Sequence, residues 1–367
     1  MTLGPRSTRS KASKTWDTVG AMADGDRARK VAVLGGGAWG TALARVLAAK
    51  GDFVHLWCRK EEHASEINGT GRNGRYLPSA QLPYSLRATH DLREALEGST
   101  MVVFVCPSHA TREVAKLAAP FVPKGVPVVS ATKGIENDSL MFVDELLTAE
   151  LPAHAHEQLA FLSGPSFAKE LAAELPTGVV IASKYPAVRE LVMRRFHAPY
   201  MRTYGSDDVP GVECGGALKN VIAIGAGAAD GLGFGNNTRG MLITRGLAEI
   251  ARLAMARGGK PITLAGLSGM GDLVLTCCGE LSRNRTVGLE LGRGGKLQDI
   301  VAGLGHVAEG VKTTKSAYDL SVKLGVDMPI TKEIYRVLYE DKPVIQAVRD
   351  LMARELSAEF EPAFGQA

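Results

Sequence analysis

The chain has 367 residues, 45% of them hydrophobic and 22% charged, which is enough for two domains with sizeable cores. The formal net charge of +4 is a mild excess that suits an anionic small molecule and is too weak to indicate a nucleic-acid partner. No apolar run approaches the roughly 18 to 20 residues that a membrane-spanning helix needs.

Residues 1–29 differ in composition from the rest of the chain. They are rich in Ser, Thr, Arg, Lys and Asp and show no apolar period, so we expect them to be disordered. They lack the apolar core of a secretory signal, and their aspartates argue against an organelle transit peptide. Met22 is an alternative start, which would make most of this extension an artefact.

The five cysteines are not arranged as a disulfide framework. Their number is odd, and the sequence contains no CxxC pair and no His/Cys cluster. We therefore expect a reducing, cytoplasmic location and no metal site. The cysteines are Cys58, Cys106, Cys214, Cys277 and Cys278.

From Lys30 onward, apolar runs alternate with helical patterns. Strands that are apolar along their whole length indicate a parallel sheet covered by helices on both faces. The sequence therefore predicts an α/β domain over residues 30–210 with a mostly parallel, doubly wound sheet. Strands are expected at 30–34, 53–59, 101–106, 127–131, 158–162 and 177–183, and helices at 41–51, at 60–67 and in a stretch that ends at 119.

After about Val212 the strand pattern stops and long helical patterns take over. We expect an all-α domain over residues 211–355, followed by a tail over 356–367. The predicted helices are 211–229, 235–257, 285–292, 309–324 and 329–340.

A glycine motif follows the first predicted strand. In GGGAWG, the residues Gly35, Gly37 and Gly40 form GxGxxG, with Ala38 and Trp39 between the last two, and the motif opens a helix. This strand–turn–helix context indicates a Rossmann dinucleotide site. The first glycine allows the tight turn, the second lets the backbone approach a pyrophosphate, and the third lets helix and strand pack closely.

The end of the second predicted strand bears on the choice of cofactor. NAD-binding proteins tend to place an acidic residue there to hold the ribose 2′-hydroxyl. This sequence has Arg59 followed by Lys60 at that point, and its glutamates come later. Arg59 suits a 2′-phosphate and favours NADP(H), with NAD(H) as an alternative; the two residues could equally be a solvated pair that opens a helix.

Polar residues follow several predicted strands, where ligands of open parallel sheets bind. Lys133 lies after the strand at 127–131, and Gly164 and Ser166 follow the strand at 158–162. In the helical half, Asp272 follows a glycine in an apolar setting. The segment Ser282-Arg283-Asn284-Arg285 resembles a capped helix start that could hold a phosphate, or be only a solvated basic turn.

Lys219 stands in the apolar and glycine-rich run GGALKNVIAIGAGAADG. Because a buried charge is costly unless it is paired, the run alone allows two interpretations. Lys219 is either a helix lysine whose ammonium reaches the surface, or a functional group held in a site.

Taken together, residues 30–355 resemble the bacterial-type NAD(P)-dependent glycerol-3-phosphate dehydrogenases. The segments that carry the resemblance occur in the family's order and spacing, and residues 1–29 lie outside it. They are GGGAWGTALA, NGRYLP, PSHA, ATKGIE, SGPSFAKE, GGALKNVIAIGAGAADGLGFGNNTRG, GMGDLVLTC, SRNR, AEGVKTTK and MPITKEIY.

The resemblance implies reduction of dihydroxyacetone phosphate to sn-glycerol 3-phosphate for phospholipid synthesis, often by a homodimer. It implies that Lys219 is the proton donor and acceptor, and that Lys133 lies where substrate and nicotinamide meet. The other implied substrate contacts are Gly164, Ser166, Asp272, Ser282, Arg283 and Asn284. The other implied cofactor contacts are Trp39, Arg59, Ala168, Arg283, Val307 and Glu309, beside the glycine loop with Ala38.

Two other functions compete with this interpretation. A dehydrogenase for a hydroxy acid or a nucleotide sugar would need a carboxylate-binding arginine or an acylating cysteine at the site. A non-catalytic NADP sensor of the same fold would be expected to lose Lys219 or Lys133, and both are present.

Overall fold

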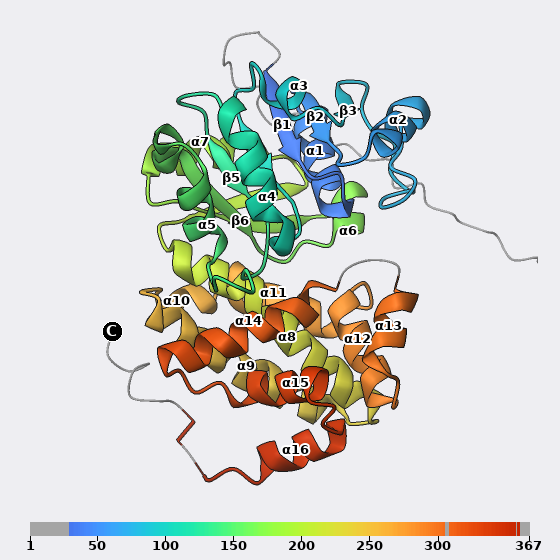
Figure 1. The fold of residues 1–367 in the computed structure, drawn as a ribbon, viewed down its shortest axis with the longest axis vertical. Coiled ribbons are helices and arrows are strands. Elements are labelled where there is room, and N and C mark those ends of the chain that lie inside the picture. The colour runs from blue at the N-terminus through green and yellow to red at the C-terminus, as the bar shows by residue number, and fades with distance from the viewer. Residues whose placement is uncertain (1–28, 305–307, 357, 360–367) are drawn as a thin grey trace, which may run out of the picture.

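The protein divides into a half built on a β-sheet and a half built of helices (Figure 1). The computed structural model describes residues 29–304, 308–356 and 358–359. The expectation of disorder over residues 1–29 therefore lies outside the described residues, apart from Arg29. Most of the tail 356–367 lies outside them as well.

A single eight-stranded sheet forms the centre of the first half. Its strand order is β3-β2-β1-β4-β5-β6-β7-β8, and every neighbouring pair is parallel except β6 and β7. The predicted mostly parallel sheet is therefore confirmed. The strands are β1 (Lys30–Leu34), β2 (Phe53–Trp57), β3 (Leu86–Thr89), β4 (Val102–Phe104), β5 (Val128–Ser130), β6 (Leu159–Ser163), β7 (Thr177–Ala182) and β8 (Met201–Ser206).

Helices bury both faces of this sheet, as the continuous apolar strands require. One core cluster joins the sheet to α1, α2, α6 and α7, and a second joins the other face to α3, α4, α5 and the start of α8. The helices of this half are α1 (Ala38–Ala49), α2 (Glu61–Thr70), α3 (Leu92–Leu96), α4 (Ser108–Ala118), α5 (Val143–Glu150), α6 (Ala168–Ala172) and α7 (Pro186–Phe196), with short 3₁₀ turns at Ala119–Phe121 and Ala153–Gln158.

The two outermost strands were not predicted, and their position explains why. β3 and β8 are the edges of the sheet, and β8 has one buried residue among its six. An edge strand needs neither a continuous apolar run nor cover on both faces, so the pattern that marks the central strands is missing.

The second half packs around the buried helix α8 (Val209–Gly231). Within the described residues, no helix is both long enough and apolar enough to cross a membrane. The remaining elements are α9 (Asn236–Ala256), α10 (Pro261–Leu264), a π-helical turn η3 (Leu267–Gly271), α11 (Asp272–Cys278), α12 (Arg283–Gly292), α13 (Leu297–Gly303), α14 (Glu309–Leu324), α15 (Pro329–Tyr339) and α16 (Val344–Met352).

Helices α8 and α12 meet backbone to backbone along a seam of glycines. A methyl group built on Gly227 would lie 2.0 Å from the carbonyl oxygen of Arg285. One built on Gly288 would lie 1.9 Å from the carbonyl oxygen of Ile224. Any larger residue would force the helices apart, so the glycine-rich sequence of α8 serves close helix packing.

Candidate active site

The glycine loop joins β1 to α1 in the geometry that a dinucleotide site requires. Gly35 has φ of +131°, a conformation that favours glycine, and a methyl group there would lie 2.7 Å from the carbonyl oxygen of Val105. A methyl group on Gly40 would lie 1.9 Å from the carbonyl oxygen of Gly35, so strand and helix meet closely. At Gly37, which caps α1, no atom lies within 4 Å of that position. The helix N-terminus is therefore open to an anion.

Three further predicted cofactor residues lie at the start of a helix or just beyond a strand. Trp39 is partly buried in the first turn of α1, and its Nε1 has no hydrogen-bond partner among the described residues. Ala168 begins α6 and packs against the same core cluster as Trp39. Arg59 is exposed just beyond β2.

A positive region that the sequence did not reveal extends from Arg59. Burial lowers the pKa of His109, and the charges of Lys312 and Arg59 lower it further. These three residues come from α4, α14 and the end of β2, so only the fold brings them together. The charges of Arg59 and Lys312 favour an anionic ligand at this edge of the sheet.

The centre of the site is a cluster of two lysines and one aspartate. Lys133 Nζ lies 2.7 Å from Asp272 Oδ2 and donates to the carbonyl oxygen of Gly164 at 3.1 Å. Lys219 Nζ donates to Asp272 Oδ1. Asp272 is fully buried and Lys219 is 8% exposed, so Lys219 is not a lysine that reaches the surface.

Three elements bring this cluster together. Lys133 follows β5, Lys219 lies midway along α8, and Asp272 begins α11 directly after the π-helical turn η3. A methyl group on Gly215 would lie 2.2 Å from the carbonyl oxygen of Ser268, so this glycine lets η3 pack onto α8. Asp272 consequently reaches Lys219, which lies four residues beyond Gly215 on α8.

The environment of Lys219 brings its pKa closer to neutrality. Burial lowers its pKa to about 8, and the Lys133 ammonium lowers it too, while the Asp272 carboxylate works in the opposite direction. Such a lysine changes protonation state close to neutral pH, as a general acid or base should. Thr276, which sequence reasoning missed, donates its hydroxyl to the backbone carbonyl of Asp272 at 2.6 Å and steadies the first turn of α11.

The predicted substrate residues after β6 lie at the same edge of the sheet. Gly164 has φ of +134°, and its carbonyl oxygen accepts hydrogen bonds from Lys133 and from the Ser166 hydroxyl, the latter at 2.8 Å. This turn therefore helps to fix the ammonium of Lys133.

The SRNR segment forms the predicted capped helix start. Ser282 caps α12 by accepting a hydrogen bond from the backbone N–H of Arg285 at 3.2 Å, and Arg283 is exposed beside it. Asn284 is buried and donates to Asn220 Oδ1 at 2.9 Å. Asn220 follows Lys219 directly and was missed as a site residue, although a second polar residue in that apolar run was the available signal.

Glu309, at the start of α14, connects the helical half to the sheet. Its carboxylate accepts a hydrogen bond from the backbone N–H of Ser108, the first residue of α4, at 3.1 Å. Burial raises the pKa of Glu309 to about 7, although Arg283, Lys133 and Lys219 oppose the shift. The predicted contact Val307 lies outside the described residues.

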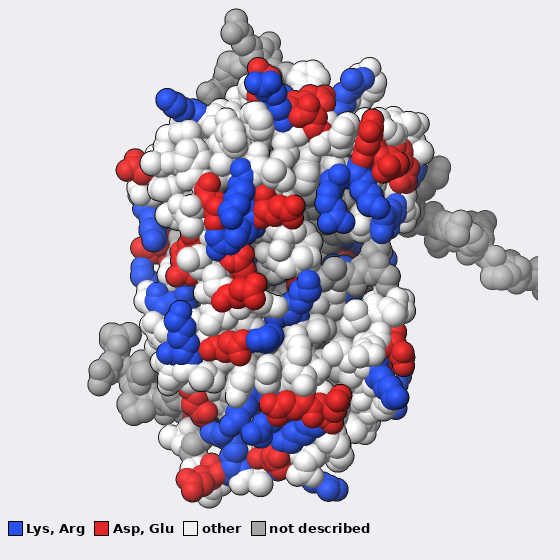
Figure 2. Space-filling view, in the orientation of Figure 1, with Lys and Arg blue, Asp and Glu red and all other residues white. Residues whose placement is uncertain are grey.

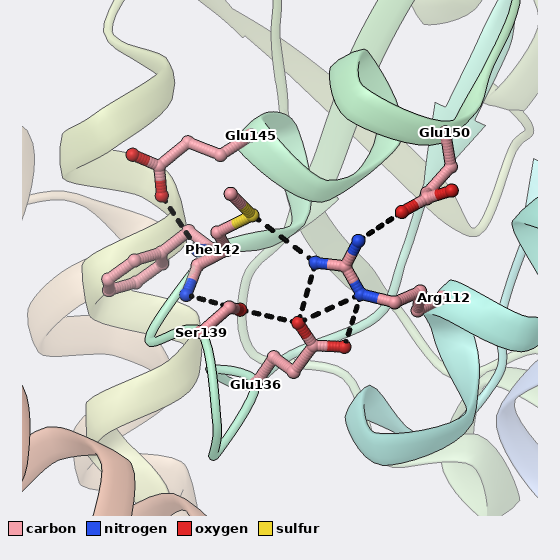
Figure 3. A network of polar contacts seen from close by, with 7 residues as sticks. Arg112, Glu136, Ser139, Phe142, Glu145 and Glu150 are labelled. Atoms are coloured by element: carbon pink, nitrogen blue, oxygen red, sulfur yellow. Dashed lines mark hydrogen bonds and ion pairs between the residues drawn. The ribbon is translucent and has the colours of Figure 1, made fainter.

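A network of polar contacts secures the loop that carries Lys133 (Figure 3). The Arg112 guanidinium of α4 binds both carboxylate oxygens of Glu136, three residues after Lys133, with Nε–Oε1 at 2.8 Å and Nη2–Oε2 at 2.7 Å. It also binds Glu150 at the end of α5, and Ser139 donates to Glu136. This pairing lowers the pKa of Glu136 and ties the loop to two helices.

A Rossmann sheet with a glycine loop, beside a buried lysine–aspartate–lysine cluster, defines a nicotinamide-dependent dehydrogenase with a separate helical domain. The models for the N-terminal and C-terminal parts of NAD-dependent glycerol-3-phosphate dehydrogenase match residues 30–188 and 208–349. The chain belongs to this family, which confirms the resemblance seen in the sequence.

Individual relatives agree along almost their whole length. The chain is 53% identical over 330 residues to glycerol-3-phosphate dehydrogenase [NAD(P)+] of Leptospira biflexa, covering 90% of this chain and 99% of the relative. It is 53% identical over 328 residues to the enzyme of that name from Myxococcus xanthus, covering 89% and 98%. The crystal structure of glycerol-3-phosphate dehydrogenase from Coxiella burnetii matches with a TM-score of 0.85 at 41% identity, covering 89% and 99%.

Proposed function

We propose that the protein catalyses the reversible NAD(P)H-dependent reduction of dihydroxyacetone phosphate to sn-glycerol 3-phosphate, which supplies phospholipid synthesis. The observation that carries this proposal is the buried cluster of Lys219, Asp272 and Lys133 at the carboxyl ends of the parallel strands. Membership of the family supports the choice of substrate.

In the proposed reaction, Lys219 transfers the proton. A nicotinamide cofactor held at the glycine loop would supply a hydride to the ketone carbon, and negative charge would then grow on the ketone oxygen. The ammonium of Lys219 stabilises that charge and gives its proton to the oxygen, with Lys133 as a second cation nearby. Asp272 holds both lysines in place. The reverse reaction uses Lys219 as the base.

The substrate phosphate would bind at the start of α12. Ser282, Arg283 and Asn284 offer a hydroxyl, an exposed guanidinium and an amide at a helix N-terminus, all of which favour a phosphate. Gly164 and Ser166 would line the carbon chain of the substrate. Holding the phosphate there would orient the ketone before reaction.

The cofactor would bind along the glycine loop, with its pyrophosphate at Gly37 and the N-terminus of α1. The open position at Gly37 and the unpartnered Nε1 of Trp39 fit such a ligand. We propose that NADP(H) is preferred and NAD(H) can be used, with Arg59 at the 2′-phosphate. The other proposed contacts are Gly35, Ala38, Gly40, Lys133, Ala168, Arg283, Val307 and Glu309.

The domain roles and partners form part of the proposal. Residues 30–210 would bind the dinucleotide and residues 211–355 the substrate, and two chains would form a homodimer. In the visible face of Figure 2, Lys and Arg alternate with Asp and Glu rather than forming a basic stripe, which supports the absence of a nucleic-acid partner. Five free cysteines, four of them buried, support a cytoplasmic location.

The test is the rate of NADPH oxidation with dihydroxyacetone phosphate against a panel of hydroxy-acid and ketone substrates. We expect turnover that depends on the phosphate group and on Lys219. Turnover of a 2-keto acid in preference to dihydroxyacetone phosphate, or cofactor binding without any turnover, would replace the proposal by one of the two rival functions. Light scattering of the purified protein tests the homodimer.

A further inference from the structure

A small cavity with both polar and apolar lining lies beside Lys133, between the ends of β5 and β6 and the first turns of α8. Its volume of about 10 Å³ for the centre of a water molecule gives room for a single water. Ser163 and Glu213 line it, together with Ser130, Thr132 and the side chain of Lys133. The proposed reaction uses none of these residues except Lys133.

Two polar atoms in the wall of this cavity have no hydrogen-bond partner among the described residues. They are Ser163 Oγ and Glu213 Oε2, and both are completely covered. Glu213 Oε1 is satisfied, because it accepts from the backbone N–H of Asp144 at 3.1 Å. A buried polar atom without a partner costs about 1–3 kcal/mol, so two such atoms on residues that line one cavity favour a shared partner.

The cavity exists because residue 216 is glycine. A methyl group on Gly216 would lie 2.7 Å from Ser163 Oγ and 3.6 Å from Lys133 Cγ. Gly216 follows Glu213 by one helical turn, so the carboxyl group and the hydroxyl border the same space beside α8. Any side chain at position 216 would crowd that space.

The surroundings of Glu213 favour its neutral form, which can donate a hydrogen bond. Burial raises its pKa well above the usual value, and the Asp144 carboxylate on α5 raises it further through its charge and a side-chain hydrogen bond, whereas Arg257 on α9 works in the opposite direction. A neutral carboxyl group carries its proton on one oxygen, and Oε1 already accepts from Asp144. The proton therefore belongs on Oε2, which can donate to the Asp144 carboxylate or to a water in the cavity.

We propose that this cavity holds one ordered water that accepts from Glu213 Oε2 and bridges to Ser163 Oγ, which makes Glu213 a positioning residue for the lysine–aspartate cluster. The proposal rests on the function proposed above. The water fastens α8 to the end of β6. Lys219 lies six residues beyond Glu213 on α8, about 9 Å along the axis, and Ser163 precedes Gly164, whose carbonyl holds Lys133.

The far side of Glu213 is held rigidly. The backbone N–H of Phe142 donates to Glu145 at 2.9 Å in the network of Figure 3, and the Phe142 ring lies 3.7 Å from the Arg257 guanidinium carbon. The start of α5, where Asp144 donates to Glu213, is therefore anchored. Glu213 accordingly joins an anchored helix start on one side to the water on the other.

The test compares Glu213→Gln and Glu213→Leu, with Glu249→Gln as a matched control. Glutamine keeps a neutral donor toward the water, so we expect kcat with dihydroxyacetone phosphate to stay within about twofold and the pH profile to be unchanged. Leucine removes the donor, so we expect kcat to fall about tenfold or more while KM for NADPH stays within about twofold. Glu249 is a buried glutamate whose pKa is also raised, but it accepts hydrogen bonds from the start of α15. Its variant should keep normal kcat.

A crystal structure of the wild-type protein at high resolution gives the direct observation. We expect one water within hydrogen-bond distance of Ser163 Oγ and Glu213 Oε2. If Glu213→Leu does not fold, Ser163→Ala takes its place, with a smaller loss of kcat in the same direction. No water at this position, normal kcat in the leucine or alanine variant, or equal losses in Glu213→Gln and Glu213→Leu would each overturn the proposal. A wild-type enzyme without activity on dihydroxyacetone phosphate would overturn the proposed function and leave the water to be judged from the crystal structure.

Discussion

Replacing Lys219 with alanine removes the ammonium group that we propose transfers the proton. Positioned acids and bases contribute roughly 10²- to 10⁴-fold to rate, or about 3–5 kcal/mol of barrier, so kcat should fall by at least about 100-fold near neutral pH. The fold should survive. In the wild type, two ammonium groups share one carboxylate, which leaves one excess positive charge. The variant keeps the Lys133–Asp272 pair at 2.7 Å, and this pair is neutral overall.

The assay measures NADPH oxidation with dihydroxyacetone phosphate, alongside NADPH affinity by fluorescence titration and the melting temperature. Because the pKa of Lys219 is lowered to about 8, the reductive rate of the wild type, which needs the protonated lysine, should fall as pH rises through about 8. The oxidative rate should rise over the same range. Lys219→Ala should show neither of these two changes of rate with pH. A loss of kcat below about tenfold, or a loss of NADPH affinity as large as the loss of kcat, would refute the assigned role.

Other substitutions test neighbouring parts of the site. Arg59→Asp should raise KM for NADPH far more than KM for NADH, and equal effects would remove Arg59 from the 2′-phosphate site. Gly40→Ala should lower stability by about 1–3 kcal/mol, because its methyl group meets a backbone carbonyl at 1.9 Å, whereas Gly37→Ala should keep its melting temperature and weaken cofactor binding. Similar melting temperatures for the two variants would contradict this. Asp272→Asn removes the carboxylate that raises the pKa of Lys219, so the fall of the reductive rate with rising pH should begin at lower pH. A pH profile like that of the wild type would count against the pairing.

The central sheet could be predicted because each buried strand is a continuous apolar run with its own signal. The glycine loop could be predicted too, since three local residues specify both the turn and the close packing of α1. The edge strands β3 and β8 lack this signal, as do short helices such as α6, whose five residues are too few to show a period.

The candidate site was harder to predict because its members are distant in the sequence. Lys133 and Asp272 are 139 residues apart, and no local pattern pairs them; the family resemblance brought them together before the fold did. Glu213 shows the remaining limit. One carboxyl group in a helix looks like a solvated charge, and only the packing of α5, α9 and β6 around it reveals a partly buried group whose pKa is raised.

The glycine seam between α8 and α12 has a consequence for motion during the catalytic cycle. Backbones in such close contact can neither slide nor separate without breaking the packing, so the two helices must move as one rigid body. Lys219 and the Ser282–Asn284 segment, which we propose holds the substrate phosphate, would therefore keep a constant spacing in any movement of the two halves.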